Sequence, residues 1–127
     1  MLFRSLHFFG ENRRAADEAA ALASGDFPRF LELVRVSGRS SLANLQNIRT
    51  DGSTTTQPVA LTLALAEDLL GGSGAVRVHG GGFAGTVQAF VPLDRLTAFR
   101  TGMESIRGSG RCHVLRIRSQ GGCVVIA

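Results

Sequence analysis

The chain has 127 residues, of which 44% are hydrophobic and 19% are charged, and its formal net charge is +4. This composition excludes a disordered chain and predicts one globular domain, residues 1–127, which is long enough to bury its own core. All 14 basic residues are arginines, but they are scattered from Arg4 to Arg118, so we expect a solvated surface and no nucleic-acid partner.

No segment has the pattern of a signal peptide or of a membrane span. The longest apolar stretch, Val59–Ala66, is short and is followed by two carboxylates. We therefore expect a soluble, cytoplasmic protein without a membrane partner. Cys112 and Cys123 are predicted to lie at different distances from the turn of one hairpin, too far apart for a disulfide, and so to remain free thiols.

Two helices are predicted first along the chain. The alanine-rich residues 5–24 predict a helix that Gly10 can break near its start, that Asn12 can cap, and that Gly25 ends. Asp26 is then the expected cap of a second helix, with Pro28 in its first turn, that extends to residue 47. Its expected apolar face comprises Phe27, Phe30, Leu31, Val34, Ser41, Leu42 and Leu45.

A loop over residues 49–56 separates these helices from a third, which begins at residues 57–58. Leu61, Leu65 and Leu69 lie on one face of this third helix, and the pair Gly71 and Gly72 ends it. The hydrophobic period then changes from helical to alternating, which indicates strands.

Four strands and one more helix are predicted in the second half. The strands span residues 75–79, 86–91, 112–118 and 123–127, and the helix spans residues 93–107 with an apolar stripe of Leu96, Phe99, Met103 and Ile106. One face of the third strand, with His113, is apolar apart from the histidine, and the other carries arginines, which favours an antiparallel sheet covered on one side. The predicted class is α+β: a two-layer sandwich of a ferredoxin-like type, in which helices cover one face of a four-stranded antiparallel sheet.

The residue types of most catalytic and metal sites are dispersed in this chain. His7, His79 and His113 are far apart, and no pair of ligands has the spacing of a zinc site, so we expect no metal. No serine lies in a G-x-S-x-G elbow, and His113 alternates with apolar residues as a structural histidine does. We expect no catalytic residue in this chain.

A glycine cluster in "VRVHGGGFAGTVQAFV" is the strongest local feature, and three of its glycines fit the spacing G-x-G-x-x-G. A dinucleotide-binding loop would be followed by a helix, whereas residues 86–91 alternate as a strand does, so this interpretation is excluded. Two interpretations stay open: a plain hairpin turn, or a loop whose backbone closely approaches a ligand or forms an anion-binding nest.

The same passage resembles the third signature of the GHMP family of small-molecule kinases, and within that family it is similar to the galactokinases. The signature is a strand, a glycine run, phenylalanine, a small residue, glycine and a second strand. The upstream segment "ENRRAADEAAALASGDFPRFLELVRVSGRSSLANLQN" also resembles the family's helix pair, so the resemblance extends over nearly the whole chain. His79 stands where the family has threonine, and Ala84 where glycine is commoner.

The resemblance implies a function for the loop. The whole enzyme would transfer the γ-phosphoryl group of ATP to galactose with Mg²⁺, giving galactose 1-phosphate. Gly80, Gly81, Gly82 and Gly85 would lie beside the nucleotide, with Phe83 as a packing anchor. Arg77 and His79 would flank the cleft, and His79 would either donate a hydrogen bond or fill space.

The resemblance also implies a missing half. The family's phosphate-binding loop, sugar-binding signature and catalytic residues belong to an N-terminal kinase domain, and no segment here matches them. We therefore expect this chain to be the C-terminal domain alone, inactive by itself and without bound ATP or Mg²⁺, with its own N-terminal kinase domain as its partner.

Two other functional classes remain. The first is a freestanding α+β regulatory or interaction module that binds a small anion or a protein. The second is an RNA-binding sheet, which would need several aromatic residues on its strands. Phe90 is the only aromatic residue on a predicted strand, so the RNA-binding class is the least favoured.

Overall fold

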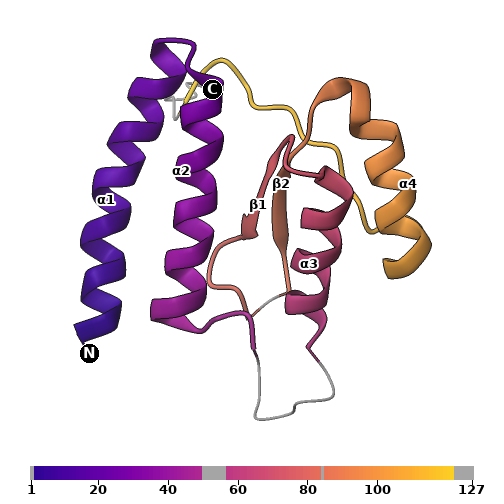
Figure 1. Cartoon of the computed structure of the whole chain (residues 1–127), viewed down its shortest axis with the longest axis horizontal. Helices are drawn as coiled ribbons and strands as arrows, with labels where there is room; N and C mark the ends of the chain where they lie inside the picture. The colour runs from indigo at the N-terminus through magenta and orange to yellow at the C-terminus, as the bar shows by residue number, and fades with distance from the viewer. Residues whose placement is uncertain (1, 50–56, 84, 122–127) are drawn as a thin grey trace, which may run out of the picture.

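The computed structural model describes residues 2–49, 57–83 and 85–121 of the chain (Figure 1). Its helices and strands confirm the α+β class. In chain order they are α1 (Leu2–Ala23), α2 (Phe27–Ser40), a π-helical turn (Ser41–Leu45), α3 (Pro58–Leu70), β1 (Ala75–Val78), β2 (Val87–Phe90), a 3-10 turn (Leu93–Arg95) and α4 (Leu96–Arg107). None of these helices combines the length and the apolar character that crossing a membrane requires.

Helix α1 is continuous through Gly10, so the predicted break there is wrong, as is a cap at Asn12. A glycine inside a helix costs only about 1 kcal/mol, which packing can offset. Here the Arg14 guanidinium lies over Gly10, about 3.0 Å from where a Cβ would be. The start of α2 is as predicted, because the Asp26 carboxylate accepts a 3.0 Å hydrogen bond from the backbone N–H of Arg29.

The apolar faces of α2 and α3 differ in part from the prediction. Phe30 and Val34 are buried, but Phe27 and Leu42 are 62% and 48% exposed, because no described element covers the two ends of that stripe. In α3, Leu61 is 56% exposed, and the buried residues are Val59, Ala66 and Leu70. Periodicity identified which faces are apolar, but it could not show how far a neighbouring element extends over them.

Strands β1 and β2 form the predicted antiparallel hairpin, in register from Ala75 opposite Phe90 to Val78 opposite Val87. Successive side chains point to opposite faces of a sheet. Ala75 and Phe90 pack with the α1–α2 pair, whereas Val76 packs with α3 and α4. Figure 1 accordingly shows the hairpin between the two helix pairs, with α1 outermost beside α2.

The expectation of a two-layer sandwich with helices on one face is therefore wrong for the described residues. That expectation rested on Arg116 and Arg118, in a segment that does not join the sheet, and one face of the β1–β2 hairpin carries Arg77 of β1. Glu11 of α1 instead lies 3.6 Å from the Arg77 guanidinium, and this charge pairing allows helices to cover that face too. Gly38 of α2 also lets the helix approach closely, because a Cβ there would lie 3.2 Å from the Cβ of Arg77.

The four-stranded, ferredoxin-like sheet is also not present, because the sheet has two strands in the described part of the chain. Residues 112–118, predicted as a strand, form no helix or strand, and Cys123–Ala127 lies outside the described residues. This segment has the alternating pattern of a strand but does not pair with the sheet. The side chains of Leu115 and Ile117, on its apolar face, are 84% and 89% exposed. Two-residue alternation predicts that a segment can pair, and not that a partner is available.

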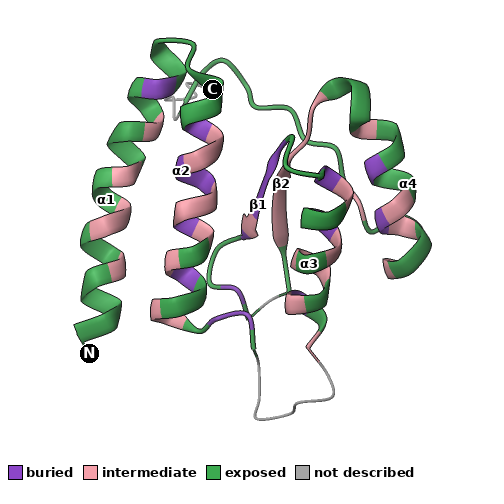
Figure 2. Ribbon diagram, in the orientation of Figure 1, coloured by how far each residue is buried: buried purple, intermediate pink, exposed green. Residues whose placement is uncertain are grey.

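Helix α4 follows the predicted stripe at its centre. Phe99 and Met103 are buried against α3 and Val76, but Ile106, near the end of the helix, is 60% exposed. Figure 2 shows the buried residues in purple, as short bands on the helices and along strand β1.

Candidate functional site

The glycine loop, residues 80–85, connects β1 to β2 as the turn of the hairpin. The backbone N–H of His79 donates to the carbonyl of Thr86 at 3.0 Å, which extends the ladder by one pair beyond the strands. Inside the loop, the N–H of Gly85 donates to the carbonyl of Gly82 at 3.0 Å. The backbone of the loop is thus closed upon itself by a local turn.

The glycines of this loop differ in what they require. Gly80, Gly82 and Gly85 have positive φ angles of +60°, +84° and +82°, a region that disfavours residues with a Cβ, whereas Gly81 does not. A Cβ at Gly80, Gly81 or Gly85 would meet nothing within 4 Å, but a Cβ at Gly82 would lie 2.2 Å from the carbonyl oxygen of Asn47. Gly82 therefore fixes the loop to the body of the domain, and the other three leave open space around the backbone.

Asn47 is the residue on which Gly82 rests. It is 3% exposed, although it follows directly after the turn that ends α2. Its side-chain oxygen Oδ1 accepts a 3.1 Å hydrogen bond from the hydroxyl of Ser41, which is 2% exposed. Buried polar groups are costly without partners, so this pair is a specific structural feature and not an accidental contact.

Phe83 and His79 lie on the outside of the loop. Phe83 is 63% exposed, so it is not a packing anchor within the described part of this chain. His79 is exposed as well. Both side chains are accessible to a partner, and their expected roles toward a nucleotide or a second domain stay predictions.

Arg77 belongs to a network under the hairpin and not to the loop. Its Nη1 lies 3.6 Å from Oε2 of Glu11, and its Nε donates to the carbonyl of Val78 at 3.2 Å. Glu11 Oε2 also accepts a 2.7 Å hydrogen bond from Ser37, and Arg14 pairs with the other oxygen. Burial opposes ionisation of Glu11, but the Ser37 hydroxyl and the two guanidiniums outweigh it, so the pKa of Glu11 lies below its usual value.

Of the predicted site residues, the structure brings the glycines, Phe83 and His79 together in one loop, and it directs Arg77 into an internal ion pair. Sequence reasoning missed Ser41 and Asn47, which lie 41 and 35 residues before Gly82. The signal for them was the polar "SGRSSLANLQN", because Ser41 lies on the expected apolar face of the helix and a buried polar side chain needs a partner.

The remaining chemistry of the described residues is sparse. No group of His, Cys, Asp or Glu among them could hold a metal ion. Cys112 is a free thiol whose pKa is raised by partial burial and by the nearby Glu104 carboxylate, which disfavours the nucleophilic thiolate form. Cys123 lies outside the described residues.

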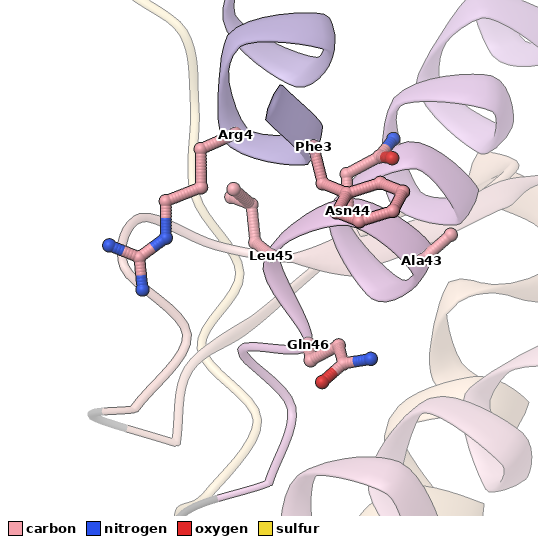
Figure 3. A pocket seen from close by; sticks show the side chains of 6 residues that line it. All are labelled: Phe3, Arg4, Ala43, Asn44, Leu45 and Gln46. Carbon is pink, nitrogen blue, oxygen red and sulfur yellow. The ribbon is translucent and has the colours of Figure 1, made fainter. Parts of the chain in front are cut away.

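A shallow cavity of about 400 Å³ lies at the start of α1 (Figure 3). Phe3 and Arg4 come from α1, and the π-helical turn and the residue after it supply the rest of the lining, Ala43, Asn44, Leu45 and Gln46. Its polar side chains are exposed or only partly buried, so it has no preformed polar site. It does border the turn that leads into Asn47.

Comparison with known proteins gives one consistent result. The chain is 35% identical over 97 residues to a galactokinase of Actinobacillus succinogenes and 34% identical over 97 residues to a galactokinase of Mannheimia succiniciproducens. Each match covers 76% of this chain but only 23% of the relative, so the chain spans about a quarter of the curated relatives it matches. No family model and no solved structure matches it. The resemblance to the galactokinases is confirmed: over three-quarters of its length, this chain is similar to a segment of those enzymes.

Proposed function

We propose that this chain is the C-terminal domain of a galactokinase-like sugar kinase of the GHMP family. The whole protein, in the cytoplasm, transfers the γ-phosphate of ATP to galactose and gives galactose 1-phosphate. The glycine loop packs beside the nucleotide, and the domain's partner is its own N-terminal kinase domain, which supplies the sugar contacts and the catalytic groups.

The geometry of the glycine loop is the observation that supports this proposal. Gly80, Gly81 and Gly85 have open space where a side chain would be, so a phosphate oxygen or a second backbone can come close to the loop, where the N–H groups of Gly80 and Gly81 are the candidate donors. Backbone N–H groups of this kind stabilise a nearby negative charge, such as that of a phosphate oxygen, although they carry no net charge themselves. In phosphoryl transfer the protein acts mainly by positioning and by stabilising charge, to which backbone N–H groups can contribute.

The chain's residues fit a supporting role toward the phosphates and no role toward the metal. The loop offers backbone donors for phosphate oxygens, whereas Mg²⁺ needs carboxylate or other oxygen ligands. The described residues offer no cluster of carboxylates. We therefore assign the Mg²⁺ ligands and the transfer step to the N-terminal kinase domain.

A domain exchange tests the proposal. The purified chain is expected to phosphorylate no galactose. The same chain, substituted for the matching segment of the Actinobacillus galactokinase, is expected to give galactose-dependent consumption of ATP well above a control that lacks the segment. A folded but inactive chimera would contradict the domain assignment. Galactose-dependent ATP hydrolysis by the chain alone would contradict the absence of catalytic residues.

Gly81→Val in the active chimera tests the role of the loop. Valine is expected to be tolerated here, since Gly81 does not have a positive φ and a Cβ at this position would meet no atom within 4 Å. We expect kcat/KM for ATP to fall about tenfold or more, a loss of about 1.4 kcal/mol of transition-state stabilisation, with an unchanged Tm. Gly121→Val, at an equally open position outside the loop, is the matched control. Full activity in Gly81→Val would make the loop a plain turn.

A further inference from the structure

The two polar residues that end α2 stand in a particular relation to the glycine loop. Ser41 begins the π-helical turn, in which the N–H of Gln46 donates to the Ser41 carbonyl at 3.1 Å, a wider turn than in an α-helix. Gln46 then adopts a left-handed conformation with φ 52°, and it is the one described residue other than glycine with a positive φ. This strained reversal directs the chain inward at Asn47, since Asn47 is buried although Gln46 is exposed.

The left-handed conformation at Gln46 brings Asn47 into contact with the glycine loop. A Cβ at Gly82 would lie 2.2 Å from the Asn47 carbonyl oxygen and 2.9 Å from its side-chain Cγ, so both the backbone and the amide group of Asn47 support Gly82. The hydroxyl of Ser41 holds the amide group in turn. Among the four glycines of the loop, Gly82 is the one whose Cβ position is occupied by a distant residue, because the Cβ positions of Gly80, Gly81 and Gly85 face open space.

We propose that Asn47, held by Ser41, is the positioning residue of the glycine loop. Asn47 fixes the position and orientation of Gly82 relative to the rest of the domain. Because Gly82 and Gly85 are joined by a hydrogen bond, Asn47 also determines the conformation of the loop and the direction in which its N–H groups point. The inference rests on the proposed function only for the role of the loop, which is to contact the nucleotide. Its mechanism is a property of this chain, and so it can be tested without nucleotide.

Hydrogen exchange in the 127-residue chain, measured residue by residue by NMR, tests this positioning. The reporters are the N–H groups of Gly85 and His79, which are hydrogen-bonded within and beside the loop. In Ser41→Ala, we expect the Gly85 N–H to exchange about tenfold faster and the Gly82 resonance to shift. Asn47→Ala should have the same effect, and the double variant should add little to either.

Ser37→Ala is the matched control. Ser37 is also fully buried, at 0% exposed, and Ser37→Ala also removes one hydrogen bond, the 2.7 Å bond to Glu11, which involves neither Asn47 nor a glycine of the loop. A general loss of packing would affect both serine variants alike. Equal exchange at Gly85 and His79 in Ser41→Ala and Ser37→Ala would therefore overturn the proposal.

Ser41→Cys keeps the test decisive if Ser41→Ala does not fold. The thiol has nearly the size of the hydroxyl and is a weaker donor, so we expect a smaller change of the same kind at Gly85. Exchange at Gly85 that is unchanged in a folded Ser41→Cys and Asn47→Ala would contradict the positioning role. An inactive chimera with normal loop protection would instead contradict the proposed function alone.

Discussion

Replacing Gly82 by alanine is expected to destabilise the chain by at least about 2 kcal/mol. The left-handed conformation at φ +84° costs an alanine about 1–2 kcal/mol. The new Cβ would also lie 2.2 Å from the Asn47 carbonyl oxygen, which is backbone and cannot rotate away as a side chain would. Asn47 is itself fixed by a buried hydrogen bond. Urea unfolding followed by circular dichroism measures the loss as a lower midpoint with an unchanged slope.

Two glycines of the same loop provide the controls for Gly82→Ala. Gly81→Ala changes neither a positive φ nor a close contact, so we expect its stability to stay within about 0.5 kcal/mol of the parent chain. Gly80→Ala has a φ of +60° but open space, so it isolates the conformational cost from the steric one. A Gly82→Ala chain that unfolds at the same urea concentration as Gly81→Ala would refute the contact with Asn47.

Glu11→Gln is expected to destabilise the chain by about 1–3 kcal/mol at neutral pH, because it removes the carboxylate that pairs directly with both Arg14 and Arg77 in a half-buried site. The loss should depend on pH. Since the folded-state pKa of Glu11 lies below its usual value of 4.5, its contribution is fully present above that pH and is lost as the pH falls through the folded pKa. The difference between the parent and Glu11→Gln should therefore shrink in acid, as thermal unfolding at a series of pH values would show.

Glu32→Gln is the matched control for this pH dependence. Glu32 also pairs with two arginines, Arg35 and Arg39, but its pairs lie at the surface, where such pairs contribute little. The nearby Glu18 has a pKa raised by burial and also by the Glu11 carboxylate, so its effect on stability has the opposite sign, and Glu11→Gln reduces it whereas Glu32→Gln does not. An equal loss in Glu11→Gln and Glu32→Gln, or a Glu11→Gln loss that persists undiminished in acid, would contradict the network.

The sequence predicted the helix ends and the hairpin well where the residue type itself favours one local conformation. Asp26 and Pro28 gave the start of α2, and Gly71 gave the end of α3 because its left-handed φ of 53° suits glycine. The alternation on both sides of the glycine cluster gave the β1–β2 hairpin. Each of these features depends on neighbours within a few residues, which the sequence displays directly.

The errors concern contacts between distant segments. The arginines of residues 112–118 suggested a wet sheet face, whereas Arg77 of β1 is paired with Glu11, which lies 66 residues earlier. Residues 112–118 alternate as a strand does, yet whether they pair depends on backbone from elsewhere in the chain. The support of Gly82 by Asn47 was equally hidden, since neither residue indicates the other. The sequence therefore located the candidate loop, and only the structure showed which glycine holds it in place.

The two-stranded sheet has a consequence for the handling of the protein. In the described part of the chain β1 and β2 pair only with each other, so each strand has one side whose backbone groups have no strand to pair with. Open edges of this kind are templates on which another chain can add a strand, which leads to aggregation. Both strands are only four residues long, and short edges offer few positions for such pairing. The brevity of the hairpin thus protects against self-association that a longer open sheet would invite.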